Sequence, residues 1–143
     1  MRTIKFRGKD QDGNWVYGDL HLLCGRFYIH TAEPPYPYSG KRKFINTDTI
    51  GQFTGLCDKN GVEIYDGDII KIVENYNDTP YNAEVKFYKG VFGVENWTEN
   101  TKNRCLTALN HFMPTIGLYD DEQEYTVEVI GNVYDNNELL TQK

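Results

Sequence analysis

The sequence predicts a mostly β protein, and three observations lead to that fold class. Aromatic residues make up 14% of the chain, and tyrosine alone occurs 11 times. Tyrosine, phenylalanine and the β-branched residues fit the pleated, half-buried surface of a sheet. Apolar and polar residues alternate in several short runs, and glycine-containing turns separate these runs. At 143 residues the chain has the size of one ordinary domain or of two small ones.

The first part of the chain predicts a hairpin followed by a third strand. Residues 3–22 alternate on both sides of a turn at Asp12–Gly13, which is the pattern of two strands in a β-hairpin. A second turn, at Cys24–Gly25, leads into a strand with the sequence "RFYIHT". Together these segments predict an N-terminal β-meander.

Three prolines among residues 33–40 end this pattern. Proline removes a backbone donor and fixes φ, so the segment "EPPYPYSG" is expected to form an extended loop. X–Pro bonds lose most of the trans preference, which makes Tyr36–Pro37 a candidate for a cis bond. We expect the loop to divide the chain into 1–46, the meander with its loop, and 47–143, a second β-domain. One continuous unit is the alternative.

The second part of the chain predicts more strands and one short helix. Residues 104–112 give the best helical pattern, because their apolar residues recur at spacings near three and four. Pro114 and Gly117 would end such a helix. The other elements expected after residue 47 are, in order, a strand at 49–56, a turn at 58–61, a short edge at 62–65, a turn at 66–67, a strand at 68–74, a hairpin over 82–95 with Lys89–Gly90 at its tip, a strand at 125–135 and a helical turn at 136–140.

Acidic residues crowd around Gly61 and Gly67. An EF-hand loop would need an aspartate five positions before its glycine, and leucine and valine occupy those two positions. Aspartate and asparagine also close turns by bonding to their own backbone, which accounts for every acidic residue in this segment. Turn chemistry is therefore the prediction, with no metal site. The alternative is a looser metal site that uses Asp58, Glu63, Asp66 and Asp68.

The other reactive side chains form no recognisable catalytic or metal motif. His21 and Cys24 have zinc-like spacing but lack a second pair of ligands. Cys57 or Cys105 could be imagined beside His111 as a nucleophile and its base, without any local signature. A buried position in a core is the expected place for such cysteines. We therefore expect no enzyme, no catalytic residue and no cofactor.

The charge of the chain disfavours nucleic acid as its main partner. The net charge is −6, and the pI is about 5.0, whereas nucleic-acid affinity comes mostly from Lys and Arg. The one dense basic run is 41–43.

No apolar stretch has the length of a membrane span, the first ten residues carry no secretory signal, and three scattered cysteines give no disulfide framework. These features predict a reduced, cytoplasmic protein.

Aromatic and basic residues gather in and after the proline-rich loop, and they form the candidate interaction surface. Tyrosine is enriched where proteins touch one another, and loops often carry function. The rings could instead fold back over an edge of the β-core. The residues of this candidate surface are Tyr36, Tyr38, Lys41, Arg42, Lys43 and Phe44.

Three segments of the chain resemble the YopX family of proteins encoded by bacteriophages and prophages. They are "IKFRGKDQDGNWVYGDL" near the N-terminus, "TIGQFTGLCDKNGVEIYDGDIIKI" in the middle and "VIGNVYDNNELL" at the end. The resemblance runs in the same order over nearly the whole chain, and the central segment is the most specific. Residues 23–46 and 95–124 show no family pattern.

The resemblance implies a mostly β fold whose C-terminal part is similar to an SH3-type barrel. The tight turns and the short helix predicted above suit such a barrel. Ile70 and Ile72 are then expected on one face of their strand and Ile69 on the other. The resemblance also implies a phage or prophage product of the bacterial cytoplasm, and it brings no enzymatic activity, cofactor or catalytic residue.

The leading functional hypothesis is a small non-catalytic protein-interaction module. Its partner would be a second copy, in a homo-oligomer, or another phage or host protein, with no membrane and no small-molecule substrate. One alternative is a β-barrel that binds single-stranded nucleic acid through Lys41–Lys43, Arg104 and exposed aromatic residues. A further alternative is a cryptic metal-dependent enzyme.

Overall fold

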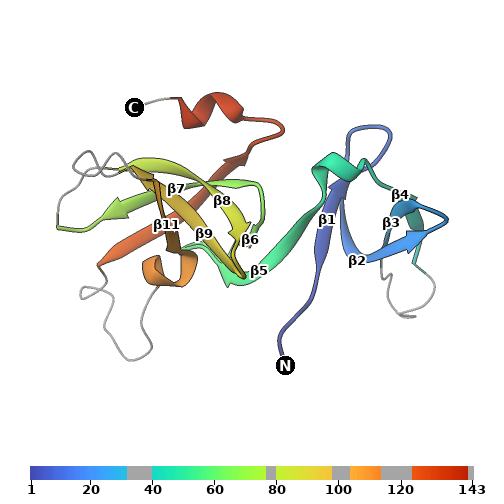
Figure 1. Ribbon diagram of the computed structural model, residues 1–143, viewed down its shortest axis with the longest axis horizontal. Coiled ribbons are helices and arrows are strands. Elements are labelled where there is room, and N and C mark those ends of the chain that lie inside the picture. Colours follow the sequence, from blue (N-terminus) through green and yellow to red (C-terminus); the bar gives the residue numbers. More distant parts are fainter. Residues whose placement is uncertain (32–39, 77–79, 98–103, 114–123, 142–143) are drawn as a thin grey trace. The chain divides into compact units, whose positions relative to one another are not determined.

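The structure is a computed structural model of the chain, and it describes residues 1–31, 40–76, 80–97, 104–113 and 124–141. The described residues form two antiparallel sheets, and their helical segments are all short 3-10 turns (Figure 1). The mostly β fold class is therefore confirmed. The chain folds as two compact units, Met1–Gly55 and Leu56–Lys143. A division into separately folding domains at residues 46 and 47 stays a prediction.

The first sheet has six strands in the order β4-β3-β2-β1-β5-β6. A 3-10 turn, η1 (Thr47–Thr49), precedes β5. The hairpin and the third strand expected at the N-terminus are confirmed, because β1 pairs with β2 and β2 pairs with β3. The strands of this sheet are β1 (Phe6–Lys9), β2 (Trp15–Leu23), β3 (Arg26–His30), β4 (Arg42–Phe44), β5 (Gly51–Cys57) and β6 (Glu63–Tyr65).

The core of the first unit is small. Val16, Ile29 and Ile45 are buried in it, and three half-buried side chains pack against them. Gly8 faces this core so closely that a Cβ on it would overlap the side chain of Ile45. The half-buried members of this core are Phe6, Leu20 and Ile50.

The second sheet has five strands in the order β10-β9-β8-β7-β11. Four strands follow one another as a meander, and the last strand then returns to pair with the first of them. Within the described residues, β10 and β11 end the sheet, and no closed barrel is found. The strands are β7 (Asp68–Glu74), β8 (Tyr81–Tyr88), β9 (Val91–Trp97), β10 (Arg104–Ala108) and β11 (Tyr125–Asn132), with the 3-10 turns η2 (Leu109–Phe112) and η4 (Asn137–Leu140).

The helix predicted over residues 104–112 is wrong. Its first five residues form β10, which pairs with β9 from Arg104 opposite Trp97 to Ala108 opposite Gly93. Only the remaining four residues turn, as the 3-10 segment η2. A short apolar pattern does not distinguish a helix from a buried strand, and here the neighbouring strand β9 supplied the backbone partners. The hairpin at 82–95 and the turn near the C-terminus are confirmed by β8–β9 and η4.

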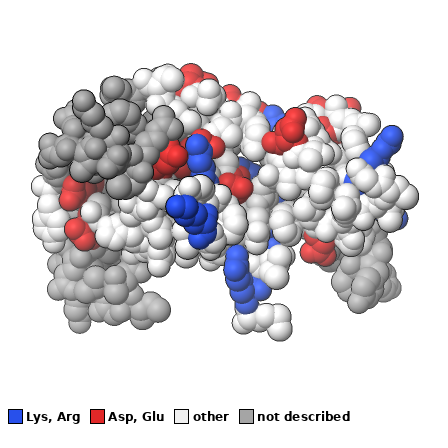
Figure 2. All heavy atoms as spheres, in the orientation of Figure 1, with Lys and Arg blue, Asp and Glu red and all other residues white. Residues whose placement is uncertain are grey.

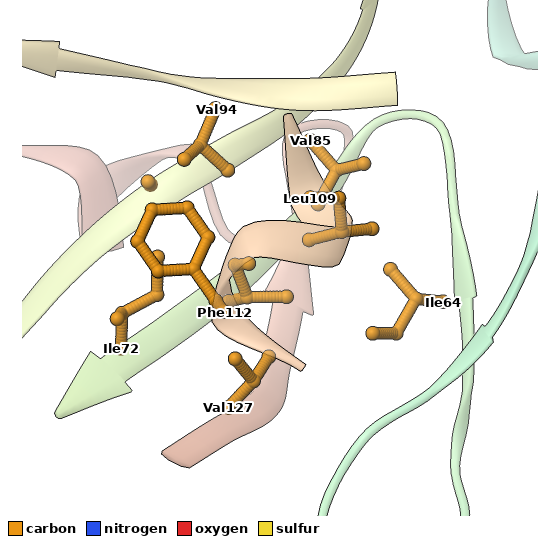
Figure 3. Packing of buried hydrophobic residues seen from close by; sticks show 9 residues of the cluster. Ile64, Ile72, Val85, Val94, Leu109, Phe112 and Val127 are labelled. Carbon is orange, nitrogen blue, oxygen red and sulfur yellow. The ribbon is translucent and has the colours of Figure 1, made fainter. Parts of the chain in front are cut away.

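The core of the second unit is larger. Leu109 and Phe112 point from η2 towards the side chains of the surrounding strands (Figure 3). Ile70 and Ile72 belong to this core, whereas Ile69 is equally buried but lies outside it, as alternation along β7 predicts. The buried members of the core are Ile64, Ile70, Ile72, Ala83, Val85, Val94, Leu109, Phe112 and Val127.

The acidic residues near Gly61 close turns, as the sequence predicted. Oδ1 of Asp58 accepts hydrogen bonds from the backbone N–H groups of Asn60 (2.8 Å) and Val62 (2.9 Å). Oδ2 of the same side chain accepts from the N–H of Val129 at 2.9 Å, in the distant strand β11. Gly61 has a φ of 79°, the left-handed region that this turn requires. Asp58 therefore holds a turn and ties it to the last strand.

The same five-residue turn occurs in the first unit around Asp10. Its Oδ1 accepts hydrogen bonds from the N–H groups of Asp12 (3.0 Å) and Asn14 (2.9 Å), and Gly13 has a φ of 82°. The pKa of the Asp10 carboxyl lies below its ordinary value of 3.8, mainly because the Asn14 backbone N–H donates to the charged form. Each unit thus contains one turn of the pattern Asp-x-Asx-Gly-x, closed by the carboxylate of its first residue.

Asp68 has a comparable role beside Gly67. Its side chain is almost fully buried, and Oδ2 accepts a hydrogen bond from the N–H of Tyr65 at 2.7 Å. Tyr65 in turn donates its hydroxyl to Oε2 of Glu63 at 2.7 Å. These contacts confirm that acidic residues organise the backbone at this turn as well.

Candidate functional site

The structure places part of the predicted interaction surface on the edge strand β4. Lys41, Arg42 and Lys43 are exposed, and Phe44 is half-buried. Within the described residues, β4 is the last strand of its sheet. Tyr36, Tyr38 and the Tyr36–Pro37 bond lie outside the described residues, as does most of the proline-rich loop.

The register of β4 separates the basic residues onto two faces. Arg42 lies opposite His30 and Phe44 opposite Tyr28, whereas Lys43 lies opposite the buried Ile29. Side chains alternate along a strand, so Arg42 and Phe44 share the outer face, and Lys43 points the other way.

Lys43 is held on its own side of the sheet by an ion pair. Its Nζ lies 3.3 Å from Oδ2 of Asp10, the aspartate that closes the first turn. The Lys43 side chain is about half exposed, so this pair is worth little to stability. The run 41–43 is therefore not a single basic patch.

The turn between β2 and β3 brings further residues to the outer face. Cys24 and Gly25 both have positive φ, 51° and 74°, which is the geometry of a two-residue hairpin turn. Leu23 consequently lies opposite Arg26, and His21 lies opposite Tyr28. The register sets these side chains beside those of β4.

We call this outer surface the β2–β4 face. Its rings and cations contact one another, since Arg42 lies over the Tyr28 ring with 6.0 Å from Cζ to the centroid, and Arg26 lies over the Phe44 ring at 5.9 Å. Tyr28 and Phe44 meet edge to face at 5.8 Å. The β2–β4 face consists of Asp19, His21, Leu23, Arg26, Tyr28, His30, Arg42 and Phe44.

A half-open hollow of about 320 Å³ lies on this surface. The His21 and His30 rings meet edge to face there, with centroids 6.0 Å apart. His30 donates its Nε2–H to the Gly40 carbonyl oxygen at 2.8 Å, because a carbonyl can only accept, and this bond fixes the orientation of the ring. The described residues that line the hollow are His21, Leu22, Leu23, His30 and Arg42.

The backbone of β4 offers hydrogen-bonding groups along the edge of the sheet. Thr31 N–H donates to the Lys41 carbonyl at 3.1 Å, and Ile45 N–H donates to the Phe27 carbonyl at 3.0 Å. Since hydrogen-bonded positions alternate along an antiparallel strand, Lys43 also faces β3. The N–H and C=O groups of Arg42 and Phe44 are then directed away from β3.

On the side of the molecule drawn in Figure 2, acidic and basic side chains are interspersed. On the β2–β4 face, Arg26 and Arg42 accompany one acidic residue, Asp19, which lies opposite His30.

One of the two cysteines expected in a core, Cys57, is not there. Cys57 is exposed, so the prediction that it packs in a core is wrong; it lies at the end of β5, where its side chain faces solvent. The side chain of Cys105 lies outside the description. His111 contacts the Phe112 and Tyr125 rings at 5.1 and 5.5 Å. In the described part of the chain, no three His, Cys, Asp or Glu side chains are grouped to hold a metal ion.

The sequence predicted the residues of β4 as part of the surface but not their neighbours in β2 and β3. His21, Arg26, Tyr28 and His30 join the surface through strand register, which no local motif reveals. The turn at Cys24–Gly25 was the usable signal, because a two-residue turn fixes which residues of β2 and β3 lie opposite each other.

The described residues thus form a small β protein of two compact units, in which arginines and aromatic rings lie next to an open strand edge. The chain belongs to the YopX protein family, whose model matches residues 5–141. This family is associated with prophages.

Two solved structures are similar to the chain over nearly its full length. The crystal structure of protein yopX from Bacillus subtilis has 26% sequence identity and a TM-score of 0.58, with 98% of this chain and 99% of that chain covered. The crystal structure of protein EF1440 from Enterococcus faecalis has 24% identity and a TM-score of 0.52, with the same coverage, and shows the fold alone. No curated protein is similar enough to the chain to count as a match.

The described residues contain no helix of the length and apolar character that a membrane span requires.

Proposed function

We propose that the chain is a non-catalytic protein-interaction module of the bacterial cytoplasm, and that it binds an extended segment of another phage or host protein along β4. The observation that carries this proposal is the edge position of β4, with the backbone groups of Arg42 and Phe44 directed outwards. An extended peptide can add to such an edge as a further strand, where backbone hydrogen bonds give affinity and alternate side chains give specificity.

The side chains next to this edge suit a binding role. Arginine and aromatic residues are enriched in protein interfaces, and Arg42, Tyr28 and Phe44 contact one another on the β2–β4 face. No reactive group is needed for such a function, which agrees with an expected absence of catalysis.

A second copy of the chain fits this edge less well than a different protein does. Antiparallel pairing of two β4 strands around Lys43 would set Arg42 of one copy opposite Phe44 of the other. Arg26 lies over the Phe44 ring, so the arginines of the two copies would approach one another. Like charges that face each other across an interface cost binding free energy.

A pair of substitutions at one position tests the edge. Arg42→Pro deletes the outward N–H and leaves the bonds to β3 in place, since proline is tolerated on sheet edges. Arg42→Gln is the matched control, because it loses the same charge but keeps the N–H. Tagged wild-type chain and both variants would be used for capture from nuclease-treated lysate of a bacterial host, with proteins read by mass spectrometry.

The proposal expects a protein captured in stoichiometric amount by the wild type, still captured by Arg42→Gln in an equal or smaller amount, and lost with Arg42→Pro. A folded Arg42→Pro variant that keeps the protein would rule out the edge. Capture of only a second copy would establish a homo-oligomer instead.

A second candidate function is binding of single-stranded nucleic acid. Cations also lie over the aromatic rings of β2: Lys9 lies over Trp15 at 5.3 Å and Lys5 over Tyr17 at 6.0 Å, whereas Arg7, 4.6 Å from the Trp15 ring, is buried. Stacking and phosphate contacts would use such residues. A captured nucleic acid that disappears after nuclease treatment would favour this candidate over a protein partner.

We also propose that the second unit is an SH3-type barrel. Its support is the return of β11 to pair with β7 and the single core enclosed by the strands and η2. Inter-strand NOEs in solution that join the two outer strands, β10 and β11, would establish closure, and their absence would leave an open sheet.

A further inference from the structure

We infer that the partner segment is acidic, and that one of its carboxylates binds in the hollow between His21, His30 and Arg42. This inference rests on the proposed function, because it assumes a strand docked on β4. It states the chemical class of the partner segment, and it places on the β2–β4 face a site that distinguishes acidic from neutral segments.

The hollow presents donors and positive charge. Arg42 carries a permanent positive charge and a planar set of N–H donors that matches a carboxylate. The two imidazole rings add hydrogen-bonding nitrogens, and Leu22 and Leu23 supply an apolar wall that a side-chain stem can contact. No carboxylate is among the described residues that line the hollow. An anionic group would therefore complement the donors and the positive charge of this lining.

The charges around the hollow favour an anion further. Arg26 lies on the same face as Arg42. Asp19 opposes this, because it lies opposite His30, but it does not line the hollow. Two arginines and one aspartate leave a small excess of positive charge on this face, whereas the whole chain has a net charge of −6. Acidic partners are steered to such a face, and basic ones are repelled.

The geometry of a docked strand explains why its side chains would reach the hollow. The residue paired with Arg42 would point to the same face as Arg42 and His30, since opposite residues in an antiparallel pair share a face. Its neighbours two positions away would do the same. A segment with acidic residues at alternate positions is therefore the best complement.

Two synthetic peptides of equal length test this inference. One alternates Glu and Thr, and the other alternates Gln and Thr, so that both favour strands and only the first is charged. Each would carry a fluorescent label, and binding to the full chain would be measured by anisotropy at about 0.1 M and about 1 M salt. A labelled single-stranded oligothymidylate serves as the third probe.

We expect the Glu peptide to bind at least about tenfold more tightly than the Gln peptide, and to weaken at high salt, because a hydrogen bond to a charged group is the stronger kind. Arg42→Gln and His21→Gln should each reduce this preference. Arg26→Gln is the matched control, since it removes one charge from the same face without lining the hollow, and it should retain most of the preference.

The outcomes separate the two proposals. Equal binding of both peptides, abolished by Arg42→Pro, would overturn the carboxylate site and leave the strand edge intact. Binding of neither peptide would overturn both. Tighter binding of the oligothymidylate than of the Glu peptide would replace an acidic protein segment with nucleic acid as the ligand.

Discussion

Gly61 shows how a single residue can set the backbone conformation of a turn. Its φ of 79° is a conformation that residues with a Cβ adopt only with strain, and a Cβ there would meet no atom within 4 Å. The cost of a substitution at Gly61 is therefore conformational and does not include a clash. Gly8 is the opposite case, because a Cβ there would overlap the Ile45 side chain.

We predict that Gly61→Val lowers the free energy of unfolding by about 1–2 kcal/mol, because a β-branched residue is penalised at positive φ. Urea unfolding followed by circular dichroism measures the change. Gly61→Asn should lose less, since asparagine tolerates this conformation. An unchanged unfolding midpoint for the valine variant would contradict the turn geometry.

At the level of single residues, the sequence predicts a contact best when its two residues are close together in the chain. The roles of Asp58 and Gly61 could be predicted because both act within one five-residue turn. The bond from Val129 to the same aspartate could not, because it joins residues 71 apart in the chain. Hydrogen bonds within one turn can therefore be predicted from the sequence, whereas a partner from a distant segment cannot.

At the scale of elements, the turn at Asp58 is also the attachment point of β11. The carboxylate accepts from three backbone N–H groups, two in its own turn and one in β11. Its charge is thus matched by donors on two elements. Removal of the carboxylate would leave all three donors without this acceptor, and the N–H of Val129 belongs to a half-buried residue.

We predict that Asp58→Ala destabilises the chain by about 2–4 kcal/mol, because several backbone donors lose their partner together. Asp58→Asn should fall between, since it can keep Oδ1 and its two bonds and lose the bond to Val129. Thermal unfolding of the three proteins gives the order.

Lys59→Ala is the control in the same turn. Its Nζ pairs with Oε2 of Glu128 at 3.0 Å, but both side chains are more than a third exposed, at 47% and 39%. Such a pair contributes at most about 1 kcal/mol. A loss for Lys59→Ala as large as that for Asp58→Ala would mean that the turn itself is fragile and that the carboxylate has no special part.

Element type was misread in one place, for a physical reason. Leu109 and Phe112 do follow helical spacing, and they do lie on one turn, η2. The residues before them pair with β9. The apolar spacing within one segment does not show whether another strand will pair with it. A spacing of three fits a 3-10 turn as well as an α-helix, so the pattern did not show how many residues of the segment are helical.

At the scale of the whole molecule, the two units differ in the size of their cores. The first buries Val16, Ile29 and Ile45, whereas the second buries nine residues in one cluster. Burial of apolar surface is the main favourable contribution to folding, so most of the stability is expected in the second unit.

We predict that backbone amides in β2 and β3 exchange with solvent deuterium at least about tenfold faster than those in β7 and β11, because local opening follows the buried apolar contacts. Native-state hydrogen exchange read by NMR or mass spectrometry compares the two sets directly. Equal protection in both units would show that they open together as one cooperative structure.

The binding face illustrates the limit of prediction at this scale. The basic run 41–43 was visible in the sequence, but the register turns Lys43 to Asp10 and Arg42 to His30. Neighbours from β2 and β3 then complete the surface. A surface built across strands depends on register, and register depends on turns and on burial of alternate residues.

The attachment of β11 to β7 and to Asp58 has a consequence for the order of synthesis. A ribosome releases the chain from its N-terminus, so every strand of the first unit is available once β5 has emerged. The second unit must wait, since β11 comes almost last and supplies a whole edge of β7. Until then the nascent chain carries a finished first unit and an incomplete second one, which makes the final stretch of translation the period in which this protein most needs protection from misfolding.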